Sequence, residues 1–415
     1  MKKILLIVPG ILALTLAACS QETGNDAAEE AESLLTSEWQ EVSEAAQGQK
    51  VNMYMWGGND NINRYLDEWV APRLKEDHDV ELNRVPMNDS QDIINQLVDE
   101  KSVGKSEGSM DIIWINGENF KAAKDNELLW GDFTGQLPNF NDYINQEAPE
   151  IATDFGEPVD GLEAPWGKAQ FVFVHDVNKS ETPPKSMDEL ADWVQENPGQ
   201  FTYPALPDFT GSAFVRHVLY ETTGGYEQYQ QPAAEIADLE TRLEPMWQYL
   251  NEIEPFLWRE GETYPESLAK QDQLFASGEI GMTMSYDPAL AASEVLKGRF
   301  PESTRTFLLD GGTLANTHFL SIPFNSSAKA GAMVAINEMM SPAAQTAKLS
   351  PKNWGDLSAL DLDKLSPEQQ QAMNDVDLGK ATLSLEELES HQLPELSADY
   401  IEIIEKGWME HVAKD

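Results

Sequence analysis

Strand-like and helical segments alternate through the first third of the chain, and this alternation limits the folds that the chain can adopt. Residues 51–56, 80–85 and 110–115 are short apolar runs typical of buried strands. Helical patterns follow them, most clearly at residues 90–101, where Ile93, Ile94, Leu97 and Val98 would share one face. Strands that alternate with helices favour a mostly parallel sheet covered by helices. The sequence therefore predicts an α/β fold.

The charge balance excludes one large class of partners. The 415 residues contain 28 Lys and Arg against 72 Asp and Glu, which gives a formal charge of −44. A nucleic acid would be repelled by so anionic a surface, because no concentrated basic patch offsets it. The apolar content of 41% is too high for a disordered chain. A folded protein of about two domains that binds no nucleic acid is expected.

The N-terminus has the features of an export signal. Lys2 and Lys3 precede an apolar stretch from Ile4 to Ala18, which is shorter than the roughly 20 residues of a spanning helix. The sequence Leu-Ala-Ala-Cys at residues 16–19 resembles the bacterial lipobox, which implies removal of residues 1–18 and a lipid on Cys19. Residues 19–32 are small and acidic and predict a tether. We expect a protein outside the cytoplasm, held at the bacterial cell membrane by the lipid on Cys19.

Further strand and helix patterns continue beyond residue 168. Residues 169–174, 281–285 and 319–323 are strand-like, and residues 187–196 and 329–340 have helical patterns. We expect the chain to cross between two lobes at residues 168–171 and 309–314. We therefore assign residues 33–168 and 313–348 to lobe 1, and residues 169–312 and 349–415 to lobe 2.

Three stretches resemble the family 1 extracellular solute-binding proteins. Residues 183–190 are similar to an element that opens a helix in that family. Residues 274–284 resemble its helix-to-strand turn, and residues 319–323 its second crossover strand. Within the family, residues 54–58, 88–92 and 114–119 look most like the YnjB-type receptors of an ABC importer. The order and spacing of these stretches cover roughly residues 50 to 350.

The resemblance implies a type II periplasmic-binding-protein fold, in which two hinged lobes close on a small molecule. It also implies an ABC permease and an ATPase as partners, no cofactor and no catalytic activity. We expect a monomer. Independently of the resemblance, ligands of open α/β sheets bind beyond the carboxyl ends of the strands, which is where binding residues are expected.

Candidate binding residues follow the expected strands of lobe 1. Trp56 ends the first strand at Gly57-Gly58, where backbone can approach a ligand closely. The other candidates in this lobe are Asn88, Asp89, Gln91, Trp114, Asn116, Glu118 and Asn119. Core packing would explain Trp56 equally simply, and helix capping would explain Asp89.

The remaining candidates lie at the crossover and in lobe 2. We expect Trp166 and Gln170 either to touch the ligand from the hinge or only to pack the hinge. Gly211 and Ser212 start a helix whose free N–H groups suit an anionic or hydroxyl group. Tyr286 and Asp287 follow a strand at a position similar to a turn whose Asp meets an amine in polyamine receptors, although Pro288 departs from that pattern. Further candidates with simpler structural explanations are Trp258, Arg259, Asn316, Thr317, His318, Asn353 and Trp354.

Aromatic rings combined with acids favour a cationic or sugar-like ligand. Lys168 and Arg259 could instead hold an anion. The six His residues are scattered and Cys19 is the only Cys, so no metal site is expected. Two alternatives remain. One is a secreted hydrolase that uses two carboxylates, and the other is a receptor with a ferric site built from Tyr residues.

Overall fold

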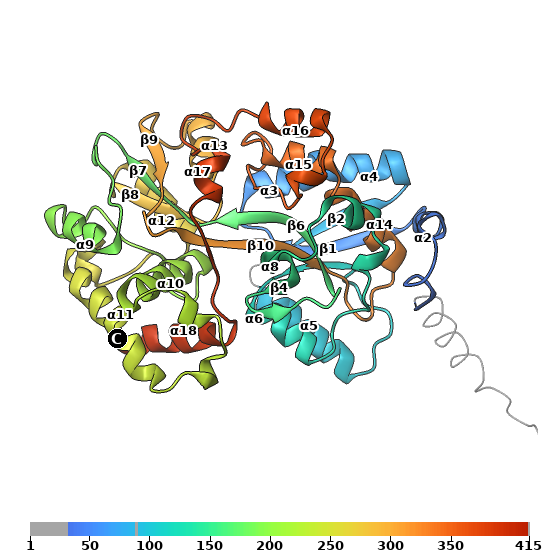
Figure 1. The fold of residues 1–415 in the computed structure, drawn as a ribbon, viewed down its shortest axis with the longest axis horizontal. Coiled ribbons are helices and arrows are strands. Elements are labelled where there is room, and N and C mark those ends of the chain that lie inside the picture. The colour runs from blue at the N-terminus through green and yellow to red at the C-terminus, as the bar shows by residue number, and fades with distance from the viewer. Residues whose placement is uncertain (1–31, 88–89, 414–415) are drawn as a thin grey trace, which may run out of the picture.

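The computed structural model describes residues 32–87 and 90–413, which form two lobes lying side by side (Figure 1). Lobe 1 contains a six-stranded sheet with the order β11-β10-β3-β1-β2, and β6 pairs with the other edge of β10. Its strands are β1 (Lys50–Trp56), β2 (Glu81–Met87), β3 (Ile112–Ile115), β6 (Glu163–Gln170), β10 (Thr313–Ser321) and β11 (Gln392–Pro394). The predicted α/β fold is confirmed.

Strand directions determine where lobe 1 faces its neighbour. β1 pairs in parallel with both β2 and β3, whereas β10 is antiparallel to β3 and to β6. β6 therefore runs in the same direction as β1 and β3, and it leaves lobe 1 at Gln170. The carboxyl ends of β1 and β3, at Trp56 and Ile115, consequently point toward lobe 2. This is the edge at which ligands of α/β sheets bind.

Lobe 2 contains a smaller sheet with the order β8-β7-β9. Its strands are β7 (Val172–Asp176), β8 (Met282–Ser285) and β9 (Thr304–Phe307), and both pairings are antiparallel. The expectation of a mostly parallel sheet is therefore wrong for this lobe. β7 continues β6 after the single residue Phe171, whereas β8 and β9 run back toward lobe 1.

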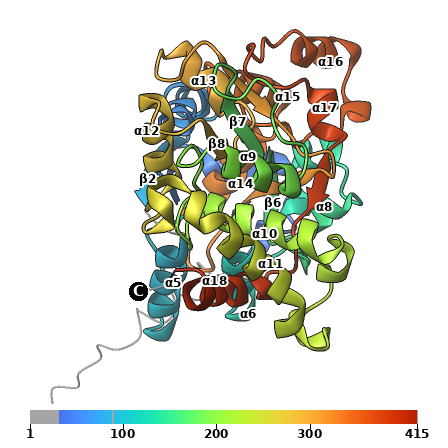
Figure 2. The same ribbon diagram turned by 90° about the vertical axis from the view of Figure 1, so that its left-hand side faces the viewer.

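Helices cover both sheets (Figures 1 and 2). Those of lobe 1 are α2 (Trp39–Ala46), α3 (Asp60–Arg64), α4 (Ala71–His78), α5 (Ser90–Ser102), α6 (Glu118–Asp125), α7 (Pro138–Tyr143), α8 (Pro149–Ala152), α14 (Lys329–Met339) and α15 (Pro342–Leu349), with a π-helical turn at Tyr65–Val70 between α3 and α4. Those of lobe 2 are α9 (Met187–Glu196), α10 (Phe209–Thr223), α11 (Leu239–Ile253), α12 (Leu268–Ser277) and α13 (Leu290–Leu296). A two-stranded hairpin, β4 (Thr153–Asp154) and β5 (Glu157–Pro158), follows α8.

The C-terminal region packs on both lobes, which differs from its assignment to lobe 2. Trp354 lies against Trp166 with ring centroids 5.0 Å apart, and α16 (Pro367–Asn374) lies beside α15. The chain then passes to lobe 2, where the N–H of Thr306 donates to the carbonyl of Ala381 at 3.0 Å. After α17 (Leu385–Glu389), α18 (Asp399–His411) packs below α10. The apolar residues of this region are spread over its length, and the region therefore packs against both lobes and connects them.

The lobes touch each other beyond the crossing strands. Asn61 on α3 donates a hydrogen bond to the hydroxyl of Ser293 on α13 at 2.5 Å. Far from this contact, the N–H of Ala398 in lobe 2 donates to the carbonyl of Phe155 in the β4–β5 hairpin at 3.0 Å. The relative placement of the lobes is therefore fixed at several separate points.

Candidate ligand-binding site

A cavity of about 290 Å³ lies between the lobes, beside the crossing strands. Lobe 1 contributes α8 and the β4–β5 hairpin, the strands β6 and β10 form one wall, and β11 with Gln230 closes the side toward lobe 2. The lining residues are Pro149, Glu150, Thr153, Asp154, Phe155, Gly156, Lys168, Gln230, Ala315, Asn316, Thr317, Phe319, Gln392, Leu393, Pro394 and Glu395.

An ion pair between a lysine and a glutamate lines this cavity. The Lys168 ammonium lies 3.1 Å from Glu150 Oε1. Burial alone would raise the pKa of Glu150, but the Lys168 charge offsets this effect and holds that pKa below its usual range. The hydroxyl of Thr317 donates to the Glu150 carbonyl at 2.6 Å and fixes α8 against β10.

A second pair lies at the wall toward lobe 2. The Arg216 guanidinium on α10 makes two hydrogen bonds of 2.9 Å to Glu395, and the Tyr286 hydroxyl donates to Glu395 Oε1 at 2.5 Å. The fully buried Arg216 also donates to the hydroxyl of Ser212 at 2.8 Å. Burial acts to lower the pKa of Arg216, but the Glu395 carboxylate more than offsets this and raises it. The guanidinium of Arg216 therefore keeps its charge in this buried pair.

Asp154 is the lining acid that no basic side chain neutralises. It is 2% exposed, and its Oδ2 accepts a hydrogen bond from the N–H of Gly117 at 2.6 Å. Burial, followed by the nearby charges of Glu118 and Glu395, raises the pKa of Asp154 well above its usual value. Glu163 lies close enough to Asp154 for their charges to interact, and burial raises the pKa of Glu163 as well. Burial therefore favours the neutral form of both acids.

The structure places the candidates of lobe 1 at the edge that faces lobe 2. Trp56 is 43% exposed at the end of β1. Gln91 is exposed on α5, and its amide donates to Asn95 at 3.3 Å. Glu118 is exposed and accepts a hydrogen bond from Asn119 at 3.2 Å. The candidates Asn88 and Asp89 lie outside the described residues.

Trp114 and Asn116 connect this edge to the crossing strands. The Trp114 indole N–H donates to Asn116 Oδ1 at 2.9 Å, and the Asn116 amide donates to the carbonyl of Thr317 at 2.7 Å. Asn116 thus contacts a residue that lines the cavity. The Trp114 ring packs against His318 with centroids 4.9 Å apart and against Trp166 at 5.2 Å.

Trp166 and Gln170 do not reach the solvent or the cavity. Both side chains are fully buried. Trp166 is enclosed by the rings of Trp114 and Trp354, while the Gln170 amide donates to the hydroxyl of Thr313 at 3.1 Å. Their predicted contact with ligand from the hinge is not present here, because both residues pack the crossing strands.

The expectation of free N–H groups at the start of α10 is wrong. Asp208 caps this helix, and its Oδ1 accepts from the N–H groups of Thr210 at 2.9 Å and Gly211 at 3.0 Å. The N–H of Ser212 donates to the Asp208 carbonyl at 2.8 Å. The amides that the sequence offered to a ligand are therefore already bonded, as an N-cap aspartate normally ensures.

Tyr286 and Asp287 lie where β8 ends toward lobe 1. The Tyr286 ring packs on Phe209, with centroids 5.0 Å apart, and its hydroxyl contacts the lining residue Glu395. Asp287 Oδ1 accepts from the N–H of Ala289 at 3.0 Å, whereas its buried Oδ2 has no hydrogen-bond partner. Burial, with the nearby Asp356 charge, raises the pKa of Asp287 to about 7.

Sequence reasoning missed most of the cavity lining. None of the principal candidates lines it, although Asn116 and Tyr286 each contact a lining residue. Lys168, Asn316 and Thr317 carried a detectable signal, because they flank the two predicted crossovers. Asp154 and Glu395 lie in segments without a recognisable strand end, so no local pattern could have found them.

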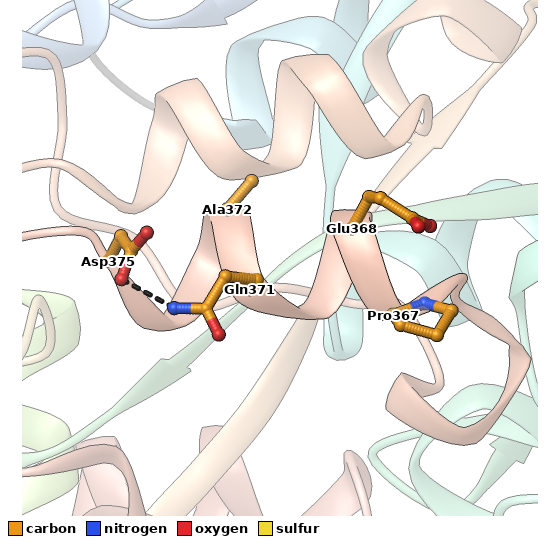
Figure 3. Close-up of a pocket in the computed structure, with 5 residues that line it drawn as sticks. All are labelled: Pro367, Glu368, Gln371, Ala372 and Asp375. Atoms are coloured by element: carbon orange, nitrogen blue, oxygen red, sulfur yellow. Dashed lines mark hydrogen bonds between the residues drawn. The ribbon is translucent and has the colours of Figure 1, made fainter.

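A second hollow lies on the surface of α16 and is unlike the interlobe cavity. Its lining residues Pro367, Glu368, Gln371, Ala372 and Asp375 all belong to this single helix or its C-terminal end (Figure 3). The Gln371 amide donates to Asp375 Oδ1 at 2.7 Å. A solute in a hollow formed by one helix would not contact both lobes, so its binding would not depend on lobe closure.

Residues 32–87 and 90–413 lack two further features. Within these ranges, no group of three or more His, Cys, Asp or Glu side chains is arranged to hold a metal ion. The same residues contain no helix with both the length and the apolar composition needed to cross a membrane.

Residues 69–361 match the family model of the bacterial extracellular solute-binding proteins. This chain belongs to that family. It is 37% identical over 338 residues to Protein YnjB of Escherichia coli (strain K12), which covers 81% of this chain and 86% of the relative. Membership was predicted from the motifs, and it is confirmed.

Solved structures support the fold. The spermidine/putrescine ABC transporter substrate-binding protein PotD of Streptococcus pneumoniae aligns with a TM-score of 0.60 and 14% identity, covering 88% of this chain and 98% of that one. A periplasmic thiamin-binding protein aligns with a TM-score of 0.59 and 16% identity, covering 88% and 96%. The family and these neighbours define the chain as an extracellular solute-binding protein of an ABC transporter, and they give no support to the hydrolase alternative.

Proposed function

We propose that this receptor captures a small polar organic cation in the interlobe cavity and delivers it to its ABC permease. The carrying observation is the cavity itself, because both lobes and both crossing strands line it. A solute held there would contact both crossing strands and both lobes, so its binding energy would favour one relative placement of the lobes. A sugar-like solute is the second candidate, since amides and hydroxyls also line the cavity.

Charge supports the cation over an anion. The lining contains three acids, Glu150, Asp154 and Glu395, but Lys168 is its only basic residue. Glu150 and Glu395 are already paired with basic side chains, whereas Asp154 has no basic partner and burial raises its pKa well above the usual value. A bound cation would favour ionisation of Asp154 and would gain a charge-assisted partner.

We also propose contacts from the predicted residues that border the cavity or the lobe edge. Trp56 and Trp114 offer ring faces on lobe 1, and Asp287 on lobe 2 offers a carboxylate oxygen without a partner. Asn116, Glu118 and Tyr286 would complete the polar surroundings. Asn88, Asp89, Gln91 and Asn119 remain proposed contacts for the open edge of the same site.

Four solutes named by structural neighbours provide a sharp test: spermidine, thiamin, γ-aminobutyrate (GABA) and fructose 6-phosphate. The temperature of thermal unfolding should rise when a cationic probe is added. A ligand at a hundredfold excess over its Kd adds about 2.7 kcal/mol to the free energy of unfolding. Isothermal titration in buffers of different ionisation enthalpy should detect proton release as Asp154 ionises. Stabilisation by fructose 6-phosphate alone would contradict the cation assignment, and the neutral variant Gln371→Ala serves as a control for nonspecific effects.

We further propose that the mature chain begins at Cys19 and is anchored by lipid there. The basic, apolar and small-residue order of the N-terminus supports this, and the site lies outside the described residues. The intact mass of protein extracted from membranes should include the lipid, and Cys19→Ala should release the protein from the membrane. An unchanged distribution of the variant would count against the anchor. Sedimentation at several concentrations should find a monomer.

A further inference from the structure

The β4–β5 hairpin of lobe 1 ends in a turn whose sequence does not suit its backbone. Asp154 pairs with Glu157, so Phe155 and Gly156 form a two-residue loop. Phe155 has a φ of +45° and Gly156 a φ of +77°. Two-residue hairpin loops with positive φ at both positions favour Asn-Gly or Asp-Gly. A bulky aromatic side chain at the first position is strained.

The Phe155 side chain leaves its own lobe and packs in the other one. It is 5% exposed and belongs to the hydrophobic cluster that contains Leu396, Ala398 and Tyr400 of lobe 2. The Arg216 guanidinium of lobe 2 lies 5.9 Å from the centre of the Phe155 ring. The backbone joins in this contact, since the Ala398 N–H donates to the Phe155 carbonyl at 3.0 Å.

The residue before the turn holds the hairpin to lobe 1. Asp154 Oδ2 accepts from the N–H of Gly117, immediately after β3. Gly117 also leaves room for the ring, because a Cβ atom there would lie 3.2 Å from Phe155. The hairpin is thus fastened to one lobe by Asp154 and to the other by Phe155, and both residues line the cavity.

We propose that Phe155 is a positioning residue that latches the two lobes in the arrangement seen here. A hairpin turn needs no aromatic residue at this position, and the interlobe contact gives the physical reason for keeping a strained one. Strained backbone persists where the surrounding structure compensates for it, and such sites are often functional. The latch acts on lobe placement and does not depend on which solute is bound.

The test compares lobe separation in Phe155→Asn, Phe155→Ala and the unaltered protein without added solute. Asn suits the turn, whereas Ala keeps the unfavourable φ, and both remove the ring. Small-angle X-ray scattering should give a larger radius of gyration for both variants, and hydrogen exchange should be faster at the Ala398 amide. The Asn variant should unfold at a higher temperature than the Ala variant, because only Asn relieves the strain.

Glu127→Asn is the matched control. Glu127 is an exposed residue of lobe 1 with a φ of +52°, and its carboxylate pairs with Lys101 of the same lobe at 3.2 Å. This change relieves similar strain and should alter neither the radius of gyration nor Ala398 exchange. Unchanged scattering and unchanged Ala398 exchange in both Phe155 variants would overturn the latch.

A further variant changes the lobe 2 side of the same contact. Ala398 has a φ of −55°, which proline accepts, so Ala398→Pro removes the N–H donor and leaves Phe155 in place. The radius of gyration should increase in the same direction. If the Phe155 variants fail to fold, unchanged scattering of Ala398→Pro overturns the proposal. A failed solute screen would leave the latch untouched, since these measurements use no solute.

Discussion

Two buried cation–carboxylate pairs tie the C-terminal region to the rest of the molecule, and they differ in what surrounds them. Lys348 lies 2.7 Å from Asp356, donates to the carbonyl groups of Trp166 and Leu357, and lies beneath the Trp354 ring. Its partner Asp356 also contacts His318 at 3.1 Å.

Arg216 and Glu395 form the other pair, and here the carboxylate lines the interlobe cavity. The Lys348 pair is packed among the aromatic side chains of Trp166, Trp354 and His318. In the Arg216 pair, Glu395 lines the interlobe cavity. The same kind of interaction is therefore enclosed in one place and adjoins the proposed binding site in the other.

The largest expected effect is on the enclosed pair. Lys348→Met leaves Asp356 buried without its cation, which should cost about 3–5 kcal/mol of unfolding free energy. Urea denaturation would measure this loss. Adding Asp356→Leu to the same chain should recover much of it, because the double variant buries no unpaired charge. A loss below about 1 kcal/mol would mean that water or His318 compensates the carboxylate, and the pair would not be enclosed as described.

Asp287, whose charge interacts with Asp356, should make stability depend on pH. Its pKa is raised to about 7 in the folded protein by burial and Asp356, with Glu294 also acting to raise it and Lys297 to lower it. The folded state therefore binds more protons than the unfolded state between about pH 4 and 7, so its stability falls as the pH rises.

Asp287→Asn should remove this dependence and stabilise the protein at pH 8 by at most about 4 kcal/mol. Denaturation at pH 5 and pH 8 measures the difference. The variant should gain stability at pH 8 and little at pH 5. Equal changes in stability at both pH values would contradict the raised pKa of Asp287.

Glu395→Gln should have a smaller effect on stability and a larger effect on binding. Gln keeps the shape but removes the charge that pairs with Arg216, at a cost of about 2 kcal/mol. The affinity for a cation that stabilises the unaltered protein should fall about tenfold, which corresponds to 1.4 kcal/mol. Lys348→Met, assayed well below its unfolding temperature, should bind that cation normally. Equal loss of affinity in both variants would remove the distinction between the two pairs.

The smallest effect is expected at the hollow on α16. Gln371→Ala removes the hydrogen bond to Asp375 at an exposed position, so unfolding free energy should change by no more than about 0.5 kcal/mol. Calorimetric titration with the same cation should give an unchanged affinity. A clear loss of binding would indicate that the cation binds at α16 and not in the interlobe cavity.

Much of the first lobe could be predicted because its signals are local. The apolar runs at residues 51–56 and 110–115 form β1 and β3, and Trp56 and Trp114 lie at or near their ends as expected. The start of α10 was predicted incorrectly because Asp208 was not recognised as the cap. Phe155 could not be predicted at all, since its partners Arg216 and Ala398 are far away in the sequence.

The sequence by itself determined the fold class, the family and the class of protein, because periodicity and short motifs are properties of neighbouring residues. Only the tertiary structure decided which acids are paired, which have a raised pKa and which line the cavity. Glu150 pairs with Lys168 at a strand crossing, Glu395 pairs with Arg216, which is distant in the sequence, and Asp154 has no basic partner and a raised pKa. Those differences arise from burial and distance in space, and the order of residues along a chain does not record either quantity.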